Sequence, residues 1–199
     1  MKRVLAAFGS AGVIRAKDFV AKGIHRKRLA EMVHVGFIDH VGNGLYRRDA
    51  RKPTEHHTLV QACVAVPGGN ICLLSALSFH GMTAQLPHQV WMAISSRSWK
   101  PTIKQPKIRF VQMAGHMHVE DLDPYTIEGV KLYVYSPART VVDCFRYRKI
   151  VGLDVALEAM QAYLKRRDRS VNELMQIAKR LRVLTSITPY LEALAHRFK

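Results

Sequence analysis

Residues 13–48 carry the pattern that most constrains the fold of this chain. They contain two short stretches in which apolar residues recur at the i, i+3, i+4 spacing of one helix face, separated by Gly23. The apolar positions are Ala16, Phe19 and Val20 in the first stretch and Leu29, Met32 and Val33 in the second. Two short helices joined by a glycine turn are typical of a helix-turn-helix, and the second helix is expected to start at Arg26.

The polar side of that second helix is rich in cations. If its three apolar residues point inward, Lys27, Glu31 and His34 point outward, and Arg26 and Arg28 flank the N-terminal end. This is the layout of a recognition helix, whose N-terminal end enters the major groove of DNA. Glu31 could accept a hydrogen bond from a cytosine amino group or only repel phosphate, and the sequence does not decide between these roles.

The segment that follows predicts a β-hairpin. Two short predicted strands, residues 37–41 and 45–48, flank Gly42-Asn43-Gly44, whose residue types tolerate positive φ. A hairpin in this place is the wing of a winged helix-turn-helix, and it ends in two arginines. The predicted DNA-binding residues are therefore Arg26, Lys27, Arg28, His34, Asn43, Arg47 and Arg48. The alternative is a protein-binding module with a solvated basic face, but clustering on helix and wing favours nucleic acid.

The charge of the chain is strongly positive and unevenly distributed. The formal net charge is +16, made up of +8 in residues 1–52, +1 in residues 53–145 and +7 in residues 146–199. A pI near 10.2 predicts a polyanionic partner, which could be DNA, RNA or an acidic protein. No apolar run approaches the ~20 residues of a membrane-spanning helix, so we expect no membrane partner.

Two domains are expected, of residues 1–52 and 53–199, because the polar stretch 49–53 ends in proline. The predicted fold is α+β, a winged helix-turn-helix followed by a mixed α/β domain that ends in a helical bundle. In the second domain, Thr54 and Asn70 are predicted to cap helices that end near residues 66 and 79. The other predicted elements are strands at 90–95, 107–113 and 132–135, a hairpin at 126–130, and helices that begin after Ser136, at Asp154, after Ser170 and after Pro189.

The chain start and the cysteines bear on the compartment. Met1-Lys2-Arg3 precedes an apolar stretch too short for a secretion signal, which fits instead the first helix of the winged module, so we expect a cytoplasmic protein. The three cysteines, Cys63, Cys72 and Cys144, are odd in number and lie in apolar surroundings. We predict buried thiols and no zinc site.

Enzymatic activity is not expected, because no known catalytic pattern appears. Glu128 and Lys131 have the wrong spacing for a restriction-type nuclease, and no phosphate-binding glycine loop or nucleophile elbow is present. His116 and His118 would share one face of a strand, but no third ligand lies nearby, so a surface pair is predicted. We therefore predict a non-enzyme with no metal and no cofactor.

Residues 71–82, residues 135–146 and Gly44-Leu45-Tyr46 together resemble the AbiEi-type antitoxin family of type IV toxin–antitoxin systems. The resemblance covers nearly the whole chain, although the first helix is brief. It implies a winged helix that represses its own operon and a C-terminal domain that neutralises a cognate nucleotidyltransferase-like toxin. The family signatures are matched by Ser-Ala-Leu at residues 75–77, beginning with Ser75, and by Arg139, Thr140 and Asp143.

Arg139 and Asp143 stand at i, i+4 on one predicted helix and can form an ion pair. The pair could be an internal clamp or a contact to the toxin, and Thr140 could bond back to the backbone. A basic run forms a second possible partner surface, which could attract an acidic toxin or more DNA, or be merely solvated. Its residues are Lys165, Arg166, Arg167 and Arg169.

Two hypotheses follow. The chain is an antitoxin that also represses its own promoter, which it would bind at repeated half-sites of double-stranded DNA, or it is a stand-alone winged-helix regulator with a ligand-sensing or assembly domain. A nucleotidyltransferase-type gene directly downstream would favour the first.

Overall fold

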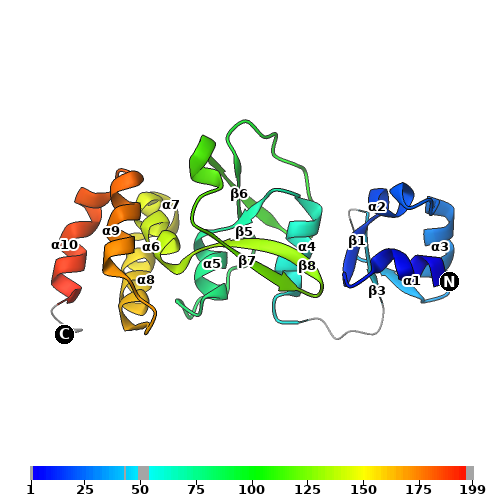
Figure 1. The fold of residues 1–199 in the computed structure, drawn as a ribbon, viewed down its shortest axis with the longest axis horizontal. Helices are drawn as coiled ribbons and strands as arrows, with labels where there is room; N and C mark the ends of the chain where they lie inside the picture. Colours follow the sequence, from blue (N-terminus) through cyan, green and yellow to red (C-terminus); the bar gives the residue numbers. More distant parts are fainter. Residues whose placement is uncertain (1, 43, 49–53, 196–199) are drawn as a thin grey trace.

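The computed structural model describes residues 2–42, 44–48 and 54–195 and is an α+β fold. It is elongated, with a small N-terminal part at one end, a mixed sheet in the middle and helices at the C-terminal end (Figure 1). The stretch 49–53, where the domain boundary is predicted, lies outside the described residues. No helix within the described residues is long and apolar enough to cross a membrane.

The N-terminal part has the winged-helix arrangement of three helices and a three-stranded antiparallel sheet. The elements in chain order are α1 (Lys2–Phe8), β1 (Val13–Arg15), α2 (Ala16–Ala21), α3 (Arg26–His34), β2 (Ile38–His40) and β3 (Leu45–Arg48). The strand order is β1-β3-β2. Gly23 takes a φ of +74° between α2 and α3, as the helix-turn-helix prediction requires. Two details differ: β1 was not predicted, and Val20 is 46% exposed rather than turned inward.

The three-stranded sheet of this part is apolar on both faces. Because side chains alternate along a strand, Ile14 and Tyr46 pack against the helices, whereas Val13 and Leu45 point the other way. Val13 and Leu45 join one apolar cluster with Val60 of the second part. The sheet is thus a layer between α3 and the rest of the molecule, and α3 lies on its far side (Figure 1).

A polar contact reinforces this junction. The amide of Gly12 donates to the carbonyl oxygen of Glu128 at 2.5 Å. The Glu128 carboxylate in turn accepts hydrogen bonds from the Thr54 amide and hydroxyl, both at 3.0 Å, and from His57 Nδ1 at 2.7 Å. The next residue, Gly129, lies so close to Ser10 that a Cβ there would collide with the Ser10 carbonyl group. The two parts therefore meet in a packed interface rather than only through a linker.

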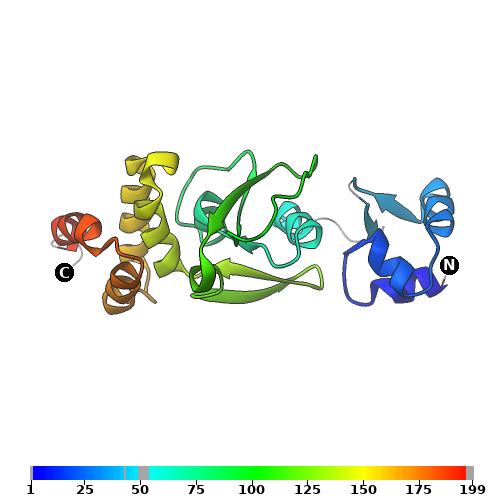
Figure 2. The same cartoon turned by 90° about the horizontal axis from the view of Figure 1, so that it is seen from above.

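The second part is a five-stranded mixed sheet followed by helices, with strand order β6-β5-β4-β8-β7. Its strands are β4 (Asn70–Ile71), β5 (Val90–Ser95), β6 (Ile108–Met113), β7 (Leu122–Ile127) and β8 (Val130–Tyr135). Its helices are α4 (His57–Ala65), α5 (Leu73–Phe79), the 3-10 turn η1 (Gly115–His118), α6 (Pro137–Arg146), α7 (Arg148–Val151), α8 (Leu153–Lys165), α9 (Val171–Arg180) and α10 (Leu184–Ala195). Figure 2 shows the C-terminal helices gathered at the end opposite the winged part.

Several predicted helix starts are confirmed by their caps. Ser136 accepts a hydrogen bond from the Arg139 amide at 3.2 Å and is followed by Pro137 at the first position of α6. Ser170 caps α9 in the same way through the Glu173 amide at 3.2 Å. Local hydrogen bonding at these two sites agrees with the tertiary packing, so a short sequence motif is sufficient to locate them.

Two predicted caps are wrong, because their side chains find distant partners instead. Asn70 begins a short central strand, and its amide group donates to the His118 carbonyl at 2.7 Å; α5 starts three residues later. Thr54 bonds Glu128, and α4 starts only at His57. In both places the side chain is turned towards a partner across the fold, so its oxygen accepts no hydrogen bond from the first turn of the following helix.

Three further predictions need correction. Pro189 does not precede the last helix but lies inside it, where the burial of Ile187 and Leu191 outweighs the lost hydrogen bond. His116 and His118 lie in η1 rather than on a strand, and His118 is buried against Asn70 instead of forming a surface pair. Of the cysteines, Cys72 and Cys144 are buried, but Cys63 is partly exposed.

Candidate nucleic-acid interface

The outward side of α3 carries the predicted recognition residues. Arg26, Lys27, Arg28, Glu31 and His34 are all exposed, whereas Leu29 and Met32 are buried on the opposite side. The helix sits at the extremity of the molecule, turned away from the second part (Figure 1). This leaves it accessible to a large partner such as a duplex, whose major groove is wide enough to admit a helix.

Some of the cationic side chains on this surface form ion pairs and others do not. Arg28 pairs with Glu31 one turn along the helix, at 2.8 Å, and both side chains are about half exposed. Across the wing, Arg47 forms an ion pair with Asp39, which faces it on the neighbouring strand. Arg26, Lys27 and His34 have no ion pair among the described residues. The free cations are therefore Arg26 and Lys27 of α3, whereas Arg28 of α3 and Arg47 of the wing are partly neutralised.

Two wing residues remain to be placed. Arg48 is partly buried, and its amide donates to the Gly12 carbonyl at 3.1 Å, so its backbone belongs to the sheet. Asn43, predicted at the wing tip, lies outside the described residues.

A basic concavity next to α3 was missed in the sequence. It is lined by Lys2, Arg3, Val4, Gly23, Ile24, His25 and Arg28. The guanidinium of Arg3 lies 3.8 Å from where a Cβ of Gly23 would be, so α1 brings its cations to the helix-turn-helix turn. Such a concavity fits one phosphate group beside the groove that α3 would enter. Only the tertiary fold joins residues 2–3 to residues 25–28, and no local pattern could have found it.

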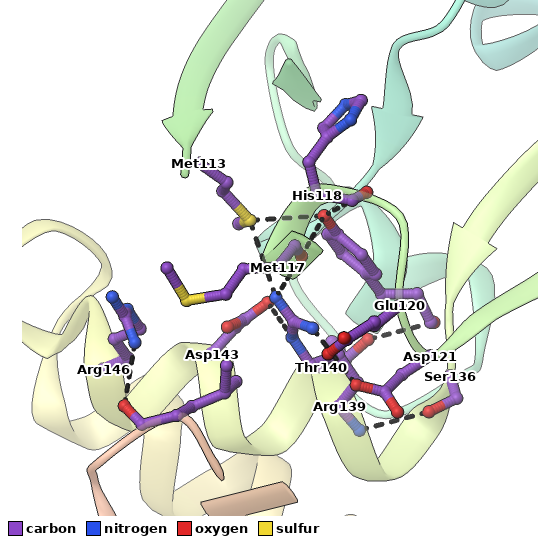
Figure 3. A network of polar contacts seen from close by, with 12 residues as sticks. Met113, Met117, His118, Glu120, Asp121, Ser136, Arg139, Thr140, Asp143 and Arg146 are labelled. Carbon is purple, nitrogen blue, oxygen red and sulfur yellow. Dashed lines mark hydrogen bonds and ion pairs between the residues drawn. The ribbon is translucent and has the colours of Figure 1, made fainter. Parts of the chain in front are cut away.

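The family-signature residues lie elsewhere and are buried. Arg139 of α6 donates from Nε to Asp143 at 2.9 Å and from one terminal nitrogen to Asp121 at 3.1 Å. Its other terminal nitrogen donates to the Met117 carbonyl at 2.9 Å, and the guanidinium stacks on the Tyr135 ring at 4.5 Å (Figure 3). The predicted pair of Arg139 and Asp143 is therefore confirmed, as part of a larger network.

The burial of this network is nearly complete. Arg139 is 1% exposed, and Asp143 is not exposed at all. Burial raises the pKa of Asp143 to about 6, although the attraction of Arg139 opposes this shift. One Asp143 oxygen, Oδ1, has no hydrogen-bond partner among the described residues. Each charge of this enclosed pair is stabilised by the other charge in place of water. Removing one partner therefore leaves an uncompensated buried charge.

The two other signature residues also have internal partners. Ser75 accepts a hydrogen bond from the Trp91 amide at 2.9 Å, which ties α5 to β5. Thr140 donates to the Tyr135 carbonyl at 3.1 Å, as the predicted bond back to the backbone requires. Both residues are at most 2% exposed. The geometry favours the internal clamp over a direct toxin contact for all four signature residues, since a partner would not reach them in this structure.

The basic run after α8 divides into bound and free cations. Arg166 is held by Asp168, at 2.8 Å, and by the His80 carbonyl, at 3.2 Å. Lys165, Arg167 and Arg169 are exposed, and Arg169 donates a hydrogen bond to the Arg166 carbonyl at 3.1 Å. The candidate partner surface of this run therefore consists of Lys165, Arg167 and Arg169, with Arg166 fixing its backbone.

Within the described part of the chain, no group of three or more histidine, cysteine, aspartate or glutamate side chains is placed to hold a metal ion. The carboxylates Asp121 and Asp143 are both bound by Arg139, and Arg180 also pairs with Asp121. They serve as acceptors within the fold, so the arrangement offers no open carboxylate cluster at this place.

The fold is similar to that in the crystal structure of the RV2827C protein from Mycobacterium tuberculosis, with a TM-score of 0.62. The two proteins are 14% identical, and the match covers 98% of this chain and 80% of that chain. At this identity the likeness shows a shared fold over both parts of the molecule. No protein-family model matches the sequence, and no curated protein matches it. The resemblance to AbiEi-type antitoxins therefore stays a prediction.

Proposed function

We propose that this protein is a DNA-binding repressor of its own operon and the antitoxin of a nucleotidyltransferase-like toxin. The observation that carries the DNA-binding half is α3, which presents Arg26, Lys27 and Arg28 to solvent at the free end of a winged-helix module. The basic concavity lined by Lys2 and Arg3 adds further phosphate-binding groups beside it. The signature resemblance supports the antitoxin half.

The DNA-binding half is tested with a labelled duplex taken from directly upstream of the reading frame. We expect binding that falls steeply as salt rises, because each neutralised phosphate releases a counterion. Shifted species in discrete steps would indicate repeated half-sites. Equal affinity for the upstream duplex and for random DNA at physiological salt would contradict operator recognition.

The antitoxin half is tested by co-expression with the adjacent gene, scoring growth and co-purification. In the full chain, Lys165→Glu, Arg167→Glu and Arg169→Glu reverse the exposed charges and leave Arg166 in place. If this surface guides an acidic toxin, rescue of growth falls while the melting temperature stays the same, since exposed charges contribute little to stability. Full rescue by this variant would show that the basic run is only solvated.

The remaining parts of the proposal follow from these two activities. A repressor and antitoxin acts where its operon and toxin are, so we place the protein in the cytoplasm. We assign it no enzymatic activity and no cofactor: its effects arise from binding.

A second function, a stand-alone regulator that senses a ligand, is favoured by one observation. A pocket lies between the two parts, lined by Val13, Arg15 and Asp18 on one side and by Cys63, Gly69 and Lys131 on the other. A ligand there would contact both modules and could change how α3 is presented. The two hypotheses are separated by the gene that follows this one, and by whether toxin co-expression alters promoter binding.

A further inference from the structure

The loop between β5 and β6 forms a second basic surface. It spans residues 96–107 and arches along the edge of the sheet, joining the end of β5 to the start of the parallel strand β6 (Figure 1). Five basic residues and no acidic residue occur between positions 96 and 109. They are Arg97, Lys100, Lys104, Lys107 and Arg109. This surface belongs to the nearly neutral middle of the chain and was not singled out in the sequence.

The cations of this loop are available for a partner. All five are exposed, and none of them forms an ion pair among the described residues. Arg109 stacks over the Trp91 ring at 4.3 Å, whereas the side chains of the other four have no hydrogen bond or ring contact among the described residues. They stand two to four residues apart along an extended chain. An array of this kind can follow the backbone of a polyanion.

An exposed tryptophan stands among these cations. Trp99 lies between Arg97 and Lys100, and its side chain is 89% exposed. The other tryptophan, Trp91, is 3% exposed. A bare indole exposes a large apolar surface to water and stabilises nothing within the chain. An indole flanked by cations is the arrangement that stacks on a nucleobase while its neighbours bind the phosphates.

The backbone that carries Trp99 is held in place. The Ser98 amide donates to the Ser95 carbonyl at 2.9 Å, and the Gln112 side chain donates to the Ser98 carbonyl at 3.2 Å. Farther along the loop, Ile103 packs on the core and Pro106 is buried. Because the loop is anchored on both sides of Trp99, little conformational freedom would be lost on binding.

We infer that this loop binds single-stranded nucleic acid, with an unpaired base stacked on Trp99 and its flanking phosphates on Arg97 and Lys100. A duplex does not offer the face of a base along its length, so it would use the cations alone. A protein partner fits less well, because protein interfaces are depleted of lysine and three of these five cations are lysines. The inference goes beyond the proposed function and does not depend on it.

The test uses the full chain and fluorescein-labelled single strands of about 12 nucleotides, oligo-dT and oligo-U, followed by anisotropy. We expect salt-sensitive binding, weakened about tenfold by Trp99→Ala and largely retained by Trp99→Phe, which keeps an aromatic face. Lys100→Ala with Lys104→Ala should reduce the slope of log affinity against log salt by about 1.4, because each phosphate contact to a single strand contributes about 0.7. The oligonucleotides should also quench the emission of Trp99, a signature that a merely structural role would not produce. Comparison of the two strands decides whether DNA or RNA is preferred.

Lys179→Ala, which removes an exposed cation of α9, is the matched control, and it should leave single-strand binding unchanged. Trp99→Ala should likewise leave binding of the upstream duplex unchanged, so the two surfaces are tested separately. No binding of either strand at about 50 mM salt, or equal binding by Trp99→Ala and the parent chain, would overturn the inference. Trp99-dependent binding only to duplex, to anionic phospholipid vesicles or to polyglutamate would also overturn it and assign the loop to that partner.

Discussion

Helices α3 and α6 both carry arginine in their first turn, and these arginines are exposed in α3 but buried in α6. Arg26 and Arg28 stand exposed at the tip of the molecule, whereas Arg139 is enclosed by two carboxylates, a carbonyl and an aromatic ring. In the sequence, Arg139 belongs to the more distinctive motif. The comparison teaches that a recognisable arginine motif can mark a structural clamp, while plainer arginines stay exposed on a free helix, where we propose that they bind DNA.

The largest effect is expected from breaking the buried clamp. Asp143→Ala leaves the Arg139 guanidinium buried without its main partner, so we expect a loss of about 3–5 kcal/mol in the free energy of unfolding. Urea denaturation measures this loss. Replacing both partners, Arg139→Met with Asp143→Leu, is the control and should cost less, because no unpaired charge remains. An unchanged midpoint for Asp143→Ala would show that the network does not clamp α6.

A smaller effect concerns the contact that joins the two parts. Burial works against the charged form of Glu128, but the hydrogen bonds from Thr54 and His57 outweigh it and hold the pKa of that carboxyl below its usual range. A carboxyl whose pKa is lower in the folded chain than in the unfolded chain stabilises the fold at pH values above its unfolded-state pKa. This stabilisation is lost as the pH falls through the pKa of the carboxyl in the folded chain.

Glu128→Gln removes this titration and should reduce the free energy of unfolding at pH 7 by on the order of 1 kcal/mol. The difference between parent and variant should shrink as the pH is lowered from about 5 towards 3. Urea denaturation over that range provides the check. A difference that stays constant with pH would contradict the ionised contact between Glu128 and His57.

The smallest effect concerns the paired cations of the proposed DNA-binding surface. Glu31→Gln frees Arg28 and removes a negative charge from α3, so binding to random duplex should tighten several-fold at low salt, with stability changed by less than about 0.5 kcal/mol. Asp39→Asn should act in the same direction through Arg47. Weaker binding by Glu31→Gln would indicate that Glu31 itself contacts a base.

The sequence predicts what local chemistry decides. The glycine turn at Gly23, the cap at Ser136 and the i, i+4 pair of Arg139 with Asp143 all depend on neighbouring residues, and all three are found as predicted. Prediction from the sequence fails where a side chain binds a residue far along the chain instead of capping the next helix. Asn70 donates a hydrogen bond to His118 of η1, and Thr54 donates one to Glu128.

The candidate site also has features that local sequence predicts and features that only the tertiary fold creates. The exposed face of α3 could be predicted from periodicity, because burial of Leu29 and Met32 fixes the outward positions. The other partners of Arg139 could not, since Asp121 and Met117 lie 18 and 22 residues away in the chain. The same holds for the concavity that Lys2 and Arg3 form with His25.

The most direct test of the account compares two sets of exposed cations on the upstream duplex. Replacing Arg26, Lys27 and Arg28 by alanine should abolish specific binding, at about 1–3 kcal/mol per base-reading contact, and leave the unfolding curve unchanged. The matched control, Lys165→Ala with Arg167→Ala, removes exposed charge from the other end of the chain and should retain specific binding. If the α3 variant binds the upstream duplex as tightly as the parent chain, α3 is not the recognition helix and the account is wrong.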